Sequence, residues 1–346
     1  MKEAGINAVR MGEFNWGRFE PQEGKFEFSD YRHLLEKLHE NGIAVLLCTP
    51  TAAPPKWMSS RYPEILKSDK TGQTVYDGNR RHCCPSSLKF REFSRRITEK
   101  MAETFRDSPA IFAWQLDNEI AAEAEHGFCF CDGCAKRFRT HLEMKYRTVE
   151  NLNAAWNGAF WSGDFTSFDE IDPRNFKRVS WKAEYAQFMS SLYTELAYEQ
   201  RDILRQVNPS WKITTNSWTS FLPDVAPDEI YPGLDFASCD TYLGNDFLEF
   251  SHSFWDYYRN IRGKRQAFTV GETGAWNPVT TQKDAYQVLR TWAWDAFAHG
   301  AENLFYFRWR QSLMGEESHP SILPWSGNPG EAYGIISRTI REIRAF

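Results

Sequence analysis

The sequence has no apolar run long enough to cross a membrane, which excludes a transmembrane protein. It also has no excess of basic residues, because 41 Lys and Arg stand against 46 Asp and Glu, for a net charge of −5. This balance argues against a protein that binds nucleic acid or an anionic membrane surface. Low-complexity tracts and Gly-rich phosphate loops are absent, and 42% of the 346 residues are hydrophobic, so the chain is expected to fold.

The first residues, MKEAGINAVR, contain no apolar segment of the kind that signal peptides carry. The seven cysteines are an odd number and form a poor disulfide framework. Free thiols together with the missing signal segment predict a reducing compartment, the cytoplasm.

Three cysteines, Cys129, Cys131 and Cys134, lie within six residues, and a fourth thiol, Cys83 or Cys84, lies upstream. Four soft ligands at such spacing are typical of a structural zinc site. Two alternatives stay open at this point: reduced thiols without a ligand, or a disulfide to Cys84. No other cluster of His, Asp and Glu has the spacing of metal ligands along the sequence.

Aromatic residues make up 16% of the chain, with 26 Phe, 14 Trp and 14 Tyr. The phenylalanines are best explained by a core. Trp and Tyr combine an apolar ring with a polar group, and they suit stacking on sugar faces and the walls of deep pockets.

Strand-like runs alternate with amphipathic stretches throughout the chain. Such alternation predicts a parallel sheet covered by helices. The expected strands are Ile6–Glu13, Ala44–Pro50, Ile111–Glu119, Lys212–Trp218, Asp235–Tyr242, Ala267–Glu272 and Asn303–Trp309. The expected helices are one that starts after Ser29–Asp30 and stops at Gly42, one with the stripe Phe90, Phe93, Ile97 and Met101, and the stretches Trp181–Gln206, His252–Arg262, Gln282–His299 and Ala332–Arg344.

Seven strands are one fewer than a closed (β/α)8 barrel needs. The opening MKEAG reads as the end of a helix whose preceding strand is missing, so we expect a single α/β barrel domain over 1–346 that lacks its first strand. A gap is then expected between Ile6–Glu13 and Asn303–Trp309. The segment 121–178 is too long for an ordinary connection and is predicted to be a cysteine-rich insertion at the carboxyl face of the barrel.

Chemistry in such barrels lies at the carboxyl ends of the strands. Glu119 ends the third visible strand and Glu272 the sixth; counting the missing strand they become the fourth and seventh, on opposite sides of the barrel mouth. Two carboxyl groups across a pocket rich in Trp and Tyr predict glycoside hydrolysis, in which one protonates the leaving oxygen and the other attacks or activates water. Asn118 can bind a substrate hydroxyl, and the charge of Arg10 can hold a carboxylate ionised.

The sequence resembles the family 42 glycoside hydrolases, which are mostly bacterial β-galactosidases. The matching stretches run in family order over nearly the whole chain, and the most specific are TPTAAPPKW and the thiol cluster with AFWS. The other stretches are AGINAVRMGEFNWGRFEPQEGKFEF, RRHCCPSS, WQLDNE, LNAAWNGAFWS, DFASCDTY and AHGAENLFYFRWRQS.

The resemblance implies a (β/α)8 barrel that releases terminal β-D-galactose from short galactosides with retention of configuration. Glu119 matches the acid/base and Glu272 the nucleophile. The sugar pocket would be shaped by Arg10, Asn118, Trp161, Tyr242, Trp276, Glu316 and His319. The zinc ligands would be Cys84, Cys129, Cys131 and Cys134, with Cys83 a bystander and no organic cofactor.

The chain departs from the family pattern in three ways. The first barrel strand and the C-terminal domains, one of which builds a homotrimer in the family, are absent, and the loop between Glu272 and Trp276 is short. A shortened loop can change which sugar fits. The same chemistry on an α-L-arabinopyranoside, β-glucoside or β-fucoside is therefore an alternative, since a pocket discriminates weakly against a missing carbon group. The second alternative is a truncated barrel that binds sugar without hydrolysing it.

Overall fold

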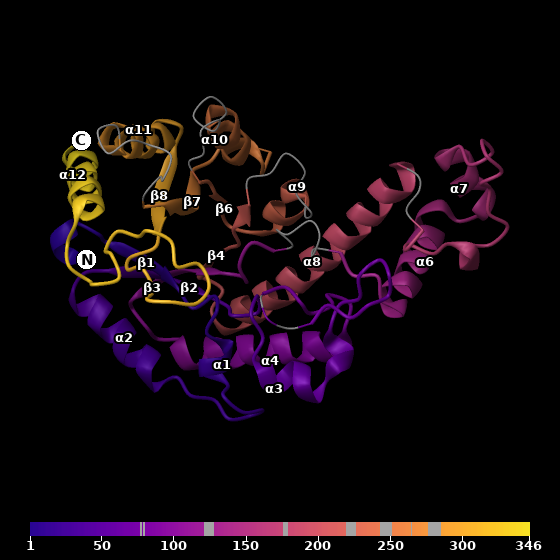
Figure 1. Cartoon of the computed structure of the whole chain (residues 1–346), viewed down its shortest axis with the longest axis horizontal. Coiled ribbons are helices and arrows are strands. Elements are labelled where there is room, and N and C mark those ends of the chain that lie inside the picture. The colour runs from indigo at the N-terminus through magenta and orange to yellow at the C-terminus, as the bar shows by residue number, and fades with distance from the viewer. Residues whose placement is uncertain are drawn as a thin grey trace.

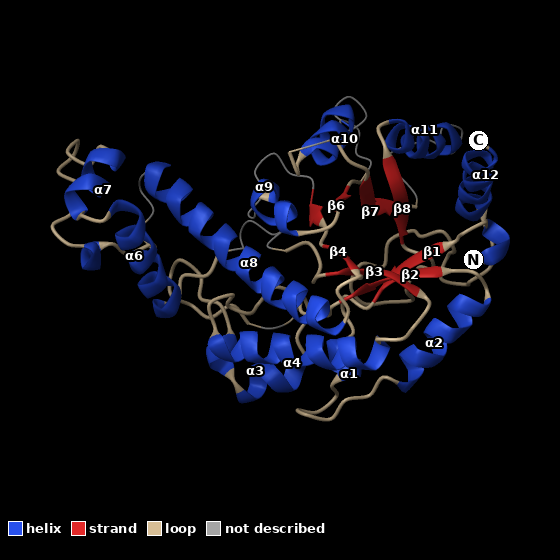
Figure 2. Cartoon of the chain, turned by 180° about the vertical axis from the view of Figure 1, so that it is seen from behind, coloured by secondary structure: helices blue, strands red, loops and turns tan. Residues whose placement is uncertain are grey.

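The computed structural model describes residues 1–76, 78, 80–120, 128–175, 179–218, 226–242, 251–263, 265–275 and 285–346. Its strands lie at the centre and form two parallel four-stranded sheets, in the orders β1-β2-β3-β4 and β5-β6-β7-β8 (Figure 2). Helices cover them from outside, as their alternation in the sequence predicts. The strands are β1 (Ala8–Met11), β2 (Ala44–Cys48), β3 (Ile111–Gln115), β4 (Lys212–Thr214), β5 (Ser217–Trp218), β6 (Ala237–Asp240), β7 (Phe268–Gly274) and β8 (Ala301–Phe307).

All seven expected strand runs are confirmed, but one of them is divided. The run predicted as a single strand over Lys212–Trp218 forms β4 and β5, which belong to different sheets. The break falls at Thr215 and Asn216, whose side chains take other partners. Thr215 Oγ1 donates to the carbonyl of Leu116 at 2.7 Å, and Asn216 is fully buried in a polar network described below.

The barrel interior is built from both sheets. Leu46 of β2, Ala113 of β3 and Phe305 of β8 form one buried cluster, against which Ala8 and Phe236 pack. Within the part of the chain that the structure describes, no backbone pairing joins β1 to β8, the two edges between which the additional strand is expected. The parallel α/β barrel is thus confirmed.

The predicted helices are confirmed, with ends shifted by a few residues. All four residues of the stripe at Phe90, Phe93, Ile97 and Met101 are buried on α4. On α2, Leu35 is buried while the preceding Leu34 is 40% exposed. The helices in the barrel layer are α1 (Trp16–Phe19), α2 (Ser29–Glu40), α3 (Lys56–Arg61), α4 (Leu88–Phe105), α8 (Val179–Val207), α9 (Pro227–Ile230), α10 (Ser251–Asn260), α11 (Ala285–Ala298) and α12 (Glu331–Ala345).

The predicted insertion at 121–178 is described only between 128 and 175, where it forms α6 (Asp132–Tyr146) and α7 (Val149–Trp156). These helices and one end of α8 extend away from the strands (Figure 1). Short 3-10 turns complete the described structure: Lys2–Ala4, Pro63–Ile65, Phe168–Glu170 and Tyr231–Gly233. Among the described helices, none has both the length and the apolarity needed to span a membrane.

Candidate active site

Glu119 lies just beyond β3, where the chain turns sharply. Asp117 and Glu119 both have left-handed backbone conformations, with φ of 59° and 43°. Such conformations are costly for residues with a side chain and persist where surrounding contacts hold them. Here Thr49 Oγ1 accepts from the amide of Asp117 at 2.7 Å, and Asn216 Oδ1 accepts from the amide of Glu119 at 2.8 Å. The turn buries the Glu119 side chain within the barrel mouth.

Glu272 lies within β7, close to the neighbouring strand β6. A Cβ at Gly271 would come within 2.8 Å of Asp240 Oδ1, so only glycine allows this approach. Arg10 Nη1 donates to Glu272 Oε1 at 2.5 Å, and the Tyr242 hydroxyl donates to Glu272 Oε2 at 2.5 Å. Each oxygen of the carboxylate therefore accepts one short hydrogen bond, and one of the two donors, Arg10, is charged.

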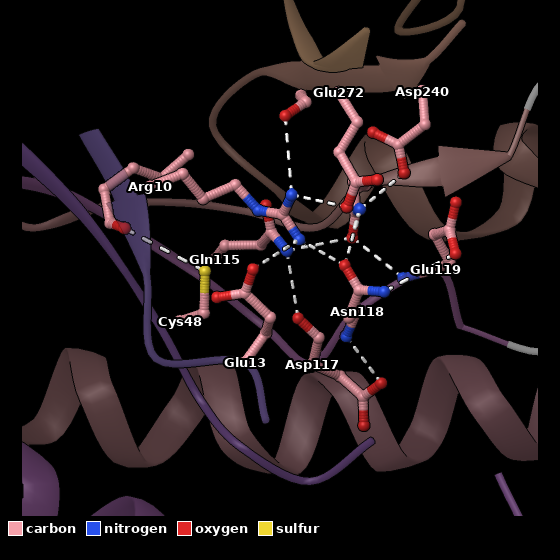
Figure 3. A network of polar contacts seen from close by, with 12 residues as sticks. Arg10, Glu13, Cys48, Gln115, Asp117, Asn118, Glu119, Asp240 and Glu272 are labelled. Atoms are coloured by element: carbon pink, nitrogen blue, oxygen red, sulfur yellow. Dashed lines mark hydrogen bonds and ion pairs between the residues drawn. The ribbon is translucent and has the colours of Figure 1, made fainter. Parts of the chain in front are cut away.

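The structure brings three carboxyl groups together at the carboxyl ends of the strands (Figure 3). One oxygen of each of Glu119, Asp240 and Glu272 lies within 4.8 Å of the others, and all three side chains are buried. Two asparagines join them. Asn118 accepts from Arg10, and Asn216 Nδ2 donates to Asn118 Oδ1 at 2.9 Å and to Asp240 Oδ2 at 2.5 Å.

The electrostatics give the groups of this cluster different proton affinities. Burial, reinforced by the charge of Glu272, raises the pKa of Glu119. Burial and the two neighbouring glutamates raise the pKa of Asp240 well above its usual range. Burial would lower the pKa of Arg10, but Glu13 and Glu272 outweigh it and raise that pKa. The cluster thus combines two carboxyl groups that retain their protons more readily than in water, Glu119 and Asp240, with the Glu272 carboxylate that Arg10 contacts.

Two contributors to the cluster were missed from the sequence. Arg80 Nη1 forms an ion pair with Glu119 Oε2 at 2.8 Å, and its charge opposes the rise in the pKa of Glu119. Asn216, which lies between β4 and β5, forms hydrogen bonds with residues at the ends of β3 and β6. Arg80 lies in the matched stretch RRHCCPSS, and Asn216 lies in an expected strand, so both were visible as polar residues near strand ends or motifs. Nothing in their spacing indicated their partners.

The other predicted pocket residues that the structure describes are exposed. Trp161 is 88% exposed, beyond the end of α7. Trp276 falls outside the described residues. Glu316 and His319 are exposed, and the ring of His319 lies 6.3 Å from that of Phe307 at the end of β8. The structure therefore brings together Arg10, Asn118 and Tyr242 with the two glutamates, but not Trp161.

The four predicted zinc ligands lie together away from the carboxyl cluster. The sulfur atoms of Cys84, Cys129, Cys131 and Cys134 are all within 4.8 Å of one another. Cys84 Sγ lies 3.7 Å from Cys131 Sγ and 3.4 Å from Cys134 Sγ. Thiolates bound at about 2.3 Å to one tetrahedral zinc ion lie roughly 3.8 Å apart, so the donor set fits such an ion. All seven cysteines are free, and no disulfide to Cys84 forms.

Comparison with known proteins agrees with this geometry. The family described as Beta-galactosidase, glycoside hydrolase family 42, matches residues 1–346. The β-galactosidase Bga of Halorubrum lacusprofundi is 34% identical, with 99% of this chain and 52% of that protein aligned. BgaA of a Thermus species is 36% identical, with 100% and 57% aligned.

A solved structure extends the comparison from sequence to fold. The β-galactosidase structure from the Antarctic haloarchaeon Halorubrum lacusprofundi superposes with a TM-score of 0.91 at 33% identity, covering 100% of this chain and 55% of the other. The chain thus spans about half the length of these relatives. Because the family match extends from the first residue to the last, the chain belongs to the β-galactosidase family, family 42 of the glycoside hydrolases.

Proposed function

We propose that this chain carries the catalytic centre of a retaining exo-β-galactosidase that acts on short galactosides. The observation that carries the proposal is the approach of Glu119 and Glu272, whose nearest carboxylate oxygens lie within 4.8 Å. Retaining glycosidases hold their two carboxyl groups about 5–5.5 Å apart, whereas inverting enzymes leave roughly 6.5–9.5 Å for a water molecule. The short separation favours direct attack by one carboxylate.

Glu272 is proposed as the nucleophile. Its carboxylate attacks the anomeric carbon and forms a glycosyl ester, while the aglycone oxygen leaves with a proton from Glu119. Glu119 then removes a proton from water, which attacks the same carbon and releases the sugar. Arg10 and Tyr242 hold the Glu272 carboxylate in place by the two 2.5 Å contacts. Burial raises the pKa of Glu119, which suits a group that must carry a proton before the first step.

The choice of galactose rests on the named relatives. Asn118 is proposed to bind a sugar hydroxyl, because its side-chain amide lies beside Glu119 at 3.5 Å. Trp161, Trp276, Glu316 and His319 stay predicted pocket residues. A related glycoside, such as an α-L-arabinopyranoside, stays the alternative substrate, since a pocket discriminates only weakly against a sugar that lacks the hydroxymethyl group.

The experiment is hydrolysis of a panel of nitrophenyl glycosides, with the anomer first released identified by NMR. The parent chain should favour the β-galactoside and release the β-anomer. Glu272→Gln should abolish turnover. Glu119→Ala should lose most activity on poor leaving groups, whereas its turnover of an activated nitrophenyl glycoside, whose aglycone leaves without protonation, should recover in part with azide. Glu302→Gln, which changes an exposed glutamate of β8, should match the parent.

Three outcomes would contradict parts of this proposal. Full activity of Glu272→Gln would end the assignment of the nucleophile. Release of the α-anomer would indicate inversion. Sugar binding by a folded parent chain without any turnover would favour the inactive binding barrel.

Zinc in the cysteine cluster is proposed in a structural role. Four thiolates leave no open position on a tetrahedral ion, so activity should need no added metal. The ion would tie the loop before α4, which carries Cys84, to the N-terminal end of α6, which follows Cys131. A homotrimer and a cytoplasmic location also stay predictions; light scattering and fractionation of the native source test them.

A further inference from the structure

A second group of metal-ligand residues lies on the outer helical layer, apart from the cysteines and the catalytic carboxyl groups. It consists of His252 on α10, Asp295 on α11 and His299, which directly follows α11. The two helices lie side by side at the edge of the molecule in both views (Figures 1 and 2). One donor atom of each residue lies within 4.8 Å of the others.

The three donor atoms form a compact triangle. His252 Nδ1 lies 3.2 Å from His299 Nε2 and 3.2 Å from Asp295 Oδ1, and His299 Nε2 lies 3.8 Å from Asp295 Oδ1. A tetrahedral zinc ion holds imidazole nitrogen at about 2.0–2.1 Å and carboxylate oxygen at about 2.0–2.2 Å, which separates its ligand atoms by roughly 3.3–3.5 Å. One ion can therefore reach all three atoms with small side-chain movements.

Neighbouring residues orient these side chains in the way that metal ligands are oriented. Asp256 Oδ1 lies 3.0 Å from His299 Nδ1, so that nitrogen carries the hydrogen and Nε2 presents its lone pair toward His252. Trp255 Nε1 donates to Asp295 Oδ2 at 2.8 Å, which leaves Oδ1 turned toward the two imidazoles. The rings of His252 and His299 stack with an interplanar angle of 26°.

We propose that His252, Asp295 and His299 bind a divalent transition-metal ion of the zinc class, with water at a fourth position. Two imidazoles and one carboxylate suit Zn²⁺ and its neighbours better than Ca²⁺ or Mg²⁺, which prefer oxygen ligands alone. Water has access, because the side chain of His252 is 59% exposed.

The ion would link α10 to the end of α11, and both helices contact β7, the strand that carries Glu272, through the clip formed by these ligands and their neighbours. Trp255, which holds Asp295, stacks on Phe268 of β7 at 5.7 Å and lies edge-on to Trp292 at 5.2 Å. Trp292 in turn donates to Thr273 Oγ1 at 3.0 Å, one residue beyond Glu272. Binding of an ion at the clip is therefore expected to stabilise this part of the barrel.

The test is equilibrium dialysis of the whole chain against Zn²⁺, with metal counted per chain. His252→Gln and His299→Gln should each bind one ion fewer than the parent, while the cysteine cluster contributes equally to all three. His33→Gln is the matched control, because His33 is an exposed histidine that lies 4.0 Å from Glu36 and belongs to none of the groups of metal-ligand residues among the described residues. It should bind as many ions as the parent.

Two further measurements guard against a general loss of structure. Asp256→Asn leaves the three ligands in place. It should weaken the affinity for Zn²⁺ by about 10–100-fold, because it removes the carboxylate that orients His299. Zn²⁺ should raise the Tm of the parent and of His33→Gln more than that of His252→Gln. Equal metal counts in the parent and both ligand variants would overturn the proposal, and so would an unchanged affinity in Asp256→Asn.

Discussion

The ion pair between Arg80 and Glu119 allows the proposed acid/base to be tested without removing it. Arg80 Nη1 lies 2.8 Å from Glu119 Oε2, and its positive charge favours the ionised form of that carboxyl group. Replacement of Arg80 by Met keeps a side chain of similar length but removes the charge. The pKa of Glu119, already raised by burial and by Glu272, should then rise further.

The size of the effect follows from the separation of the charges. Two unit charges about 4 Å apart interact by about 4 kcal/mol at an effective dielectric constant of 20, which is equivalent to roughly three pH units. The Arg80 side chain is 22% exposed, so solvent screens part of this interaction. An opposite charge at this range typically contributes 1–3 units, and we expect about 1–2 pH units here.

The measurement is the pH dependence of kcat/KM on a β-galactoside with a poor leaving group, which needs proton donation. The alkaline limb of this profile reports loss of the proton from the acid in the free enzyme. In Arg80→Met it should move to higher pH by about 1–2 units, whereas Arg80→Lys, which keeps the charge, should move it less. Arg61→Met is the matched control, because Arg61 pairs at 3.1 Å with Glu23 on the surface.

An alkaline limb that stays in place in Arg80→Met, or moves to lower pH, would refute the assignment of Glu119 as the titrating acid. A limb that moves equally in Arg61→Met would show that net charge, rather than this ion pair, is responsible. Circular dichroism and thermal melting of each variant check that the fold is retained.

Three other perturbations probe the rest of the chain. Cys84→Ser should lower the zinc content measured by elemental analysis and the Tm, because it removes one of four clustered thiols; an unchanged zinc content would contradict the structural site. Phe93→Ala should lower the free energy of unfolding in urea by about 3–5 kcal/mol, because Phe93 is fully buried against Trp57 and Tyr62; a loss under about 1 kcal/mol would contradict its place in the core. Burial would raise the pKa of Glu184, but contacts with His141, Lys145 and Tyr146 outweigh it and lower the pKa from 4.5 to about 2. This carboxylate therefore stabilises the fold above pH 4.5, and its contribution is lost as the pH falls toward about 2. Glu184→Gln should therefore cost about 1–2 kcal/mol at neutral pH, because solvent screens the partly exposed Lys145, and little near pH 2, as urea titrations at several pH values would measure.

The order of strands and helices could be predicted from local sequence. Each strand is a short apolar run that ends in polar residues, and a stripe such as Phe93, Ile97 and Met101 can form only one buried helix face. The break at Thr215–Asn216 could not be predicted in this way. It depends on side-chain partners from β3 and β6, which no local pattern records.

Some residues of the candidate site could likewise be predicted from the sequence, and others could not. Glu119, Glu272 and Arg10 were found because the carboxyl ends of parallel strands meet at one face, and a residue that ends a strand is placed there by the fold class alone. The contact between Arg80 and Glu119 depends on the path of a loop, and nothing in the spacing of the two residues predicts it.

Local sequence patterns and motifs were therefore enough to predict the barrel, the family and the residue types of the two clusters that lie at strand ends or in a tight cysteine motif. Only the folded structure shows that the pKa values of Glu119 and Asp240 are raised, because they depend on burial and on charges from other strands. It alone also joined His252 to Asp295 and His299, since the ligands sit on two helices that meet only after packing on the sheet. Periodicity and motif spacing describe neighbours along the chain, whereas proton affinity and metal coordination depend on neighbours in space.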